Sequence, residues 1–139
     1  MINVKDVIRM KVPFPTINSN LAVQAHMYIC GKSSAHGYGF IKCQTLKPNM
    51  IGSSKFTHYV DEEPDASRNP FTHTSRIDCD KFFITESVCY DDNLKTTLRP
   101  DVCQELYDDV QRELIADGYN EISMNENELT SLNYLIKKI

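Results

Sequence analysis

The residues of this chain best suited to chemistry lie close together in residues 72–85, which read THTSRIDCDKFFIT. If this stretch is a β-strand, alternate side chains share a face, so Arg76, Asp78 and Asp80 point the same way. Ile77 and Cys79 then face the core. One guanidinium and two carboxylates on a common face can bind a phosphate and move a proton. The alternative is a solvated strand face that carries an ion pair between Arg76 and Asp78 or Asp80.

Other strands are needed to hold such a face in place. Alternating or continuous apolar side chains predict strands at residues 4–12, 21–30, 40–45 and 55–60, and residues 72–85 form a long strand. The runs between them contain Gly, Pro, Asn and Ser, and the segment GKSSAHGYG is read as a turn. Short strands with such connections favour a small barrel or a tightly curved sheet.

The periodicity changes near residue 99. Val102, Leu106, Val110 and Leu114 recur every four residues, which predicts an amphipathic helix over residues 99–117. Pro100 suits its first turn and Gly118 its end. A second helix is predicted for about residues 125–138. Strands first and helices last indicate one β-rich α+β domain over residues 1–139, because both kinds of element must bury an apolar face.

Charge is distributed unevenly along the chain, whose formal net charge is −4. Residues 1–60 hold seven Lys or Arg and one acid, a balance of +6, while residues 61–139 hold eight and eighteen, a balance of −10. The basic half is suited to an anionic partner. Two halves that neutralise each other in the fold are the alternative.

Cysteine and histidine spacing predicts neither a metal nor another cofactor. The five cysteines form no CxxC pair and the four histidines no HExxH motif, so most of the cysteines are interpreted as small buried groups. No apolar run reaches the roughly 20 residues that a membrane span needs, and the start of the chain lacks the apolar core of a signal peptide. We therefore expect a cytoplasmic protein.

Four motifs in order add a family resemblance. They are DVIRMKVPFP at residues 6–15, IKCQT at 41–45, IDCDKFFIT at 77–85 and LRPDVCQELYDDVQREL at 98–114. Together they resemble the MazF/PemK family of toxin endoribonucleases, including its Kid-like members. The resemblance implies a dimeric SH3-like barrel that cleaves single-stranded RNA without metal and is bound by a small acidic antitoxin.

The same resemblance implies site residues. Asp80 matches the family's acid and would act as the base, and Thr45 would hydrogen-bond the phosphate. Arg76 and His26 are further catalytic candidates, although an ion pair for Arg76 and a core position for His26 are the simpler interpretations. The residues expected to bind RNA are Gln24, Lys11, Lys42 and Lys47.

This chain departs from the family pattern at two cations. Gln24 and Ala25 stand where the family usually has Arg-Pro, and Asp78 stands where Kid-like members carry arginine. Losing one stabiliser of a charged phosphorane typically costs about a hundredfold in rate. The alternative function is therefore an inactive protein- or RNA-binding module of plasmid or phage origin; poisoning of a topoisomerase is a third, from fold analogy alone.

Residues 119–139 extend beyond the part that resembles the family. With an acidic start and an apolar helical face, they are expected either to mask the RNA site or to cover a dimer surface. The alternative is a helix that completes the core.

Overall fold

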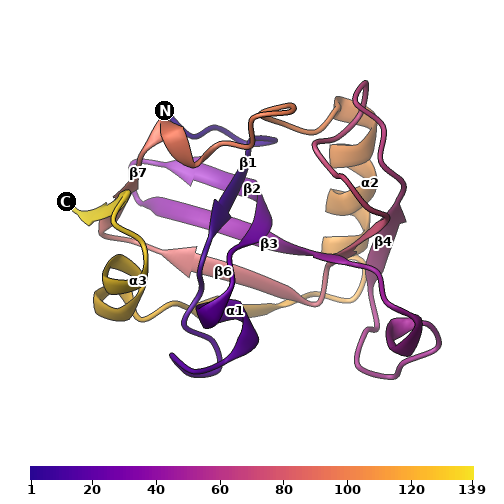
Figure 1. Cartoon of the computed structure of the whole chain (residues 1–139), viewed down its shortest axis with the longest axis horizontal. Coiled ribbons are helices and arrows are strands. Elements are labelled where there is room, and N and C mark those ends of the chain that lie inside the picture. Colours follow the sequence, from indigo (N-terminus) through magenta and orange to yellow (C-terminus); the bar gives the residue numbers. More distant parts are fainter.

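A computed structural model describes residues 1–139 as a curved sheet with helices on both sides (Figure 1). The strands are β1 (Val7–Met10), β2 (His26–Ser34), β3 (Gly37–Thr45), β4 (Tyr59–Glu62), β5 (Ser75–Asp78), β6 (Lys81–Thr85), β7 (Val88–Tyr90), β8 (Asn120–Ser123) and β9 (Ile136–Lys138). The helices are α1 (Asn20–Val23), α2 (Gln104–Ile115) and α3 (Glu126–Leu132). Two 3-10 turns are η1 (Pro48–Met50) and η2 (Asp92–Leu94).

Strand β3 is the centre of the sheet. It pairs with β2 along one edge, and its other edge is shared by β5 and β6, in the overall order β1-β2-β3-β5-β4 with β8 added beyond β6. The sheet does not close into a barrel. The β-rich α+β class is thus confirmed. A closed barrel is not observed, and the likeness to an SH3-like fold stays a prediction.

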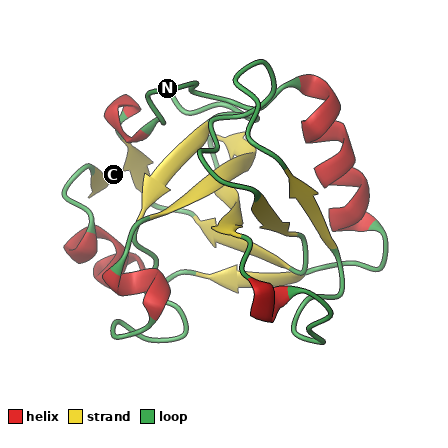
Figure 2. Cartoon of the chain, turned by 45° about the vertical axis from the view of Figure 1, so that its right-hand side comes forward, coloured by secondary structure: helices red, strands yellow, loops and turns green.

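Each face of the sheet carries its own core, because successive side chains of a strand point to opposite faces. Ile29 and Ile41 lie in one cluster with Leu106 and Val110 of α2. The neighbouring side chains Tyr28, Cys30 and Phe40 lie in the other cluster with Leu129 of α3 and Ile136 of β9. Figure 2 shows the strands between α2 and the α3 region.

Helix α2 starts at Gln104, five residues later than predicted. The segment before it is held extended, because the Val102 N–H donates to the Lys5 carbonyl and the Cys103 N–H to the Arg68 carbonyl. The Cys103 sulfur then caps the helix by accepting the Leu106 N–H. Val102 is still fully buried, so the predicted apolar stripe is correct even where the helix is absent.

The long strand predicted for residues 72–85 is broken at Cys79 and Asp80. Its two halves pair with β3 in different registers, Ile77 opposite Cys43 and Phe83 opposite Phe40. Between these two pairings the chain has five residues, 78–82, where β3 has only two, 41–42. The three additional residues are accommodated by a turn at Cys79 and Asp80. Asp80 accordingly does not lie on a strand face beside residue 78.

The second predicted strand and the turn after it also differ from the structure. Residues 20–23 form α1, and β2 then runs to Ser34, so most of GKSSAHGYG is a paired hairpin. Gly37 adopts a φ of 130°, and a Cβ atom there would lie 2.1 Å from the Thr85 carbonyl oxygen. Only glycine permits β3 and β6 to approach so closely here.

Residues 119–139 complete the fold. Strand β8 lies parallel to β6, α3 contributes the fully buried Leu129, and β9 pairs with β7. The predicted second helix ends at Leu132, where the Asn133 side chain accepts the Lys11 N–H and donates to the Lys11 carbonyl. Of the two interpretations of this segment, completion of the core is the one observed. None of the helices has both the length and the apolar composition that a membrane span requires.

Candidate functional site

Two adjoining hollows lie at the end of the sheet where β2 begins and β3 ends. The first has a volume of about 220 Å³ and is lined by Arg9, Ala25, His26, Met27, Cys43, Thr45, Phe71, Thr72, His73 and Ser75. The second, of about 440 Å³, is lined by Asn20, Gln24, Ala25, His26, Gln44, Thr45, Lys47, Asn49, Met50, Ser53, Lys55 and Phe56. Because they share Ala25, His26 and Thr45, we treat them together as the acid-free groove.

No aspartate or glutamate lines the acid-free groove, although the chain holds 19 acids against 15 Lys and Arg. Its cations are Arg9, Lys47 and Lys55, and none of them belongs to the ion pairs of the structure. Cations without an ion-pair partner produce a positive potential in a concave site whose lining holds no carboxylate, and such a potential attracts anions. Lys55 also borders a neighbouring hollow that contains acids.

His26 stands at the junction of the two hollows. Its Nδ1 lies 3.0 Å from the Gln24 carbonyl oxygen, so the proton belongs on Nδ1 and the lone pair of the neutral ring on Nε2. Burial lowers the pKa of His26, the hydrogen bond to Gln24 opposes this, and the nearby cations Lys42, Arg9 and Lys47 lower it further. At neutral pH His26 is therefore an uncharged base.

Only some of the predicted site residues meet. The groove brings together Gln24, His26, Thr45 and Lys47, which come from separate parts of the N-terminal half. Arg76, Asp80, Lys42 and Lys11 line neither hollow. The structure adds Arg9, Lys55 and His73, and no sequence signal distinguished His73 from the other scattered histidines.

Arg76 is buried, with 3% of its surface exposed. Its Nε and Nη2 donate to the two carboxylate oxygens of Asp61, at 2.8 and 2.9 Å, and Nη1 donates to the Met50 carbonyl at 2.9 Å. Hydrogen bonding to Asp61 raises the pKa of Arg76. The expected exposed ion pair with Asp78 or Asp80 is wrong, because Asp61 of the neighbouring strand β4 lies directly opposite Arg76.

Asp78 of β5 and Lys42 of the neighbouring strand β3 form a buried salt bridge. The Lys42 Nζ lies 3.4 Å from the Asp78 Oδ2, and Lys81 Nζ lies 3.5 Å from the same oxygen. Asp78 is 1% exposed. Burial lowers the pKa of Lys42 and Asp78 opposes the effect. Lys42 was expected to bind RNA, but its ammonium is turned into this pair and away from solvent.

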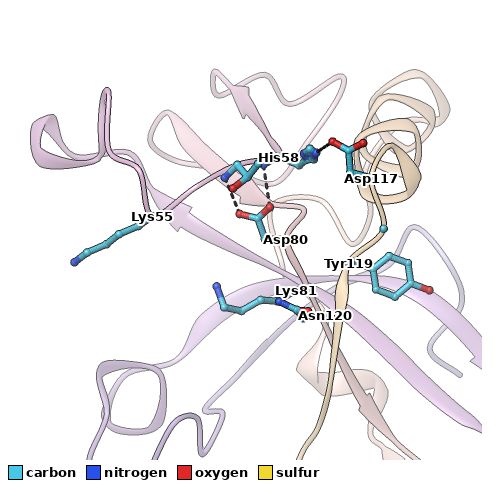
Figure 3. A pocket seen from close by; sticks show the side chains of 9 residues that line it. Lys55, His58, Asp80, Lys81, Asp117, Tyr119 and Asn120 are labelled. Carbon is cyan, nitrogen blue, oxygen red and sulfur yellow. Dashed lines mark hydrogen bonds and ion pairs between the residues drawn. The ribbon is translucent and has the colours of Figure 1, made fainter.

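A third hollow of about 490 Å³ contains Asp80 (Figure 3). It is lined by Lys55, Thr57, His58, Asp80, Lys81, Asp117, Gly118, Tyr119 and Asn120. The Asp80 carboxylate accepts the Thr57 N–H at 2.8 Å and the His58 N–H at 2.9 Å. Each oxygen of the Asp80 carboxylate thus already accepts one backbone hydrogen bond. These contacts place Asp80 as a support for the loop before β4.

His58 and Asp117 are joined by a hydrogen bond in the third hollow, with Nε2 2.9 Å from Oδ2. The side chain of His58 is 13% exposed and that of Asp117 81% exposed. In a catalytic histidine-carboxylate pair the acid is buried and the imidazole faces the substrate. The arrangement here is the reverse, so the pair fixes the position of the Asp117 carboxylate and does not activate His58.

Comparison with protein-family models, with curated proteins and with solved structures finds no match for this chain. The resemblance to the MazF/PemK family, together with the homodimer and the acidic antitoxin that it implies, therefore stays a prediction.

Proposed function

We propose that this protein binds single-stranded RNA along the acid-free groove. The observation that carries the proposal is the set of three unpaired cations, Arg9, Lys47 and Lys55, in a groove without acids. Phosphate contacts supply most of the affinity of such sites, and aromatic side chains add stacking. Phe56, which is partly exposed in the second hollow, offers a ring for a base.

The shape of the groove favours a single strand over a duplex. Arg9, Met27 and Cys43 lie in register on one face of the sheet and line the first hollow. Gln44, the next residue along β3, points to the other face and lines the second hollow. The groove therefore turns around the end of the sheet. A flexible single strand can follow such a turn, whereas duplexes resist sharp bending.

A second function, metal-independent cleavage of the bound RNA, is favoured by one further observation: His26 and His73 line the same hollow as Arg9. In this scheme His26 Nε2 removes the proton of a ribose 2′-hydroxyl, and the 2′-oxygen attacks the adjacent phosphorus. His73 in its protonated form gives a proton to the leaving 5′-oxygen. The products are a 2′,3′-cyclic phosphate and a free 5′-hydroxyl.

The other side chains of the first hollow suit the charge that develops in this reaction. Arg9 neutralises the phosphorane, and the Thr45 hydroxyl, which is exposed at the end of β3, donates to one of its oxygens. Asp80, expected from the family resemblance to be the base, takes no part. A toxin that acts with an antitoxin remains a proposal from that resemblance alone.

Binding is tested with a fluorescent 2′-O-methyl oligouridine, which cannot be cleaved by this route. Replacing Arg9, Lys47 and Lys55 one at a time by Gln should weaken binding and lower the slope of log K against log salt by about 0.7 for each lost phosphate contact. Lys137→Gln on β9 makes the same charge change on an exposed strand outside the groove. Equal losses in the control and the groove variants would overturn the proposal.

Cleavage is tested with an unmodified RNA of the same sequence in the presence of a chelator. The expected products carry a cyclic phosphate, and His26→Gln or His73→Gln should reduce the rate about a hundredfold or more. Intact RNA at high protein concentration, with binding retained, would leave the RNA-binding function standing and reject the cleavage.

A further inference from the structure

We propose that the third hollow is a base-specific subsite for guanine, which continues the acid-free groove. This inference rests on the proposed binding of single-stranded RNA. Lys55 lines both the second and the third hollow, so the two hollows meet at its side chain. A strand that leaves the groove past Lys55 would enter the third hollow next, and Figure 3 shows Lys55 at one side of that hollow.

The charges of the third hollow are mixed, in contrast to those of the groove. Lys55 and Lys81 lie on one side in Figure 3, and Asp117 and Tyr119 lie on the other. The Lys81 ammonium already forms a salt bridge with Asp78, with Nζ 3.5 Å from Oδ2. A free phosphate in the middle would face the carboxylates of Asp80 and Asp117. A ligand with an anionic end and an end rich in N–H donors fits both sides, and a nucleotide has this composition.

Asp117 has the acceptor capacity to read a base. Only its Oδ2 is engaged, by His58, and Oδ1 makes no hydrogen bond in the structure. A carboxylate offers about four acceptor positions on two oxygens. Guanine presents two adjacent donors, N1–H and the 2-amino group, that can bind one carboxylate in a bidentate manner. Uracil, adenine and cytosine present a single donor group on the same edge.

Backbone and ring contacts fix several walls of the hollow. Gly118 has a φ of 80°, which turns the chain after α2 and separates Asp117 from Tyr119. The Tyr119 ring packs edge-on against Phe82 with centroids 5.4 Å apart, and the Asn120 N–H donates to the Asp80 carbonyl at 2.9 Å. His58 is thus a positioning residue for the Asp117 carboxylate, and Tyr119 provides a ring beside the base.

The experiment compares 2′-O-methyl oligonucleotides that differ at one central position in an oligouridine. The guanine oligonucleotide should bind about tenfold more tightly than the uridine, adenine or inosine versions. The inosine version is the sharpest comparison, because its base differs from guanine only by the missing 2-amino group. Asp117→Asn should bring the ratio of guanine to uridine affinity close to one. Asp108→Asn, an equal charge change at an exposed position of α2, should keep the ratio.

The possible results separate this inference from the function on which it rests. Binding that depends on Arg9 and Lys47 but is equal for guanine and uridine would overturn the guanine subsite alone. A guanine preference that survives Asp117→Asn would also overturn it. Failure of every oligonucleotide to bind would overturn both proposals.

Discussion

The guanidinium of Arg76 binds both carboxylate oxygens of Asp61, and this bidentate pair holds the guanidinium against the loop that leads from β3 to β4. The same guanidinium donates to the Met50 carbonyl and lies over the rings of Tyr59 and Phe56, at 3.7 and 5.1 Å from their centroids. Residues Lys47, Lys55 and Phe56 of the groove belong to this loop. Arg76 is therefore a positioning residue for the proposed RNA site.

We expect Arg76→Ala to lower the free energy of unfolding by about 2–3 kcal/mol, because it leaves Asp61 and the Met50 carbonyl without their partner. Arg76→Lys should recover only part of this loss, since lysine lacks the planar fork. Urea denaturation measures both. Arg112→Ala removes an exposed arginine with one carboxylate contact and should cost under about 1 kcal/mol. Equal losses at the two positions would contradict the anchoring role.

Asp80→Asn should lower stability by about 1–3 kcal/mol, because an amide can accept only one of the two backbone N–H groups and turns a donor toward the other. Thermal unfolding measures the loss. Asp91→Asn is the control, since Asp91 is exposed and accepts a single N–H from Asn93. A variant of Asp80 that keeps full stability but loses all RNA cleavage would instead show that Asp80 is the base.

The lowered pKa of His26 predicts a pH dependence of stability. The unfolded chain binds a proton at His26 near the ordinary value of about 6.5, while the folded protein resists protonation until a lower pH. The contribution of His26 to the free energy of unfolding is therefore fully present above about pH 6.5, and it is lost as the pH falls toward the pKa of the folded protein. Unfolding measured from pH 7.5 to 5 should show this slope, and His26→Gln should reduce it. His36→Gln, at an exposed turn position, should leave it in place.

Thiol reactivity should separate the exposed Cys89 from the three buried cysteines; Cys103 is partly exposed and should react at an intermediate rate. Cys89 is exposed, whereas Cys30, Cys43 and Cys79 are buried, and burial raises the pKa of Cys30 and of Cys79 to about 12. A disulfide reagent at pH 8 should modify Cys89 at once and the three buried thiols only on unfolding. Cys89→Ser should remove the fastest phase and leave the slower reaction of Cys103. Rapid modification of Cys30, Cys43 or Cys79 in native protein, identified by peptide mapping, would show that a buried position opens.

Local sequence patterns were sufficient for the class of fold. Alternation around Arg76 predicted that Ile77 and Cys79 face the core, and both lie there; the four-residue spacing from Val102 to Leu114 identified the stripe that α2 buries. The break at Cys79 and Asp80 was not predictable, because it follows from two pairings with β3 in different registers. The end of α3 was missed for the same reason, since β9 exists only where β7 can pair with it.

The sequence by itself determined that a basic N-terminal half contains Gln24, His26, Thr45 and Lys47, four residues of the groove. Only the tertiary structure decided which charges stay free. Arg76, Lys42 and Asp80 are engaged by Asp61, Asp78 and the backbone of the loop before β4. Arg9 and His73, 64 positions apart in the chain, meet in one hollow because β1 and β5 are placed by β2 and β3. Neutralisation and proximity depend on distances across strands, which spacing along the chain does not record.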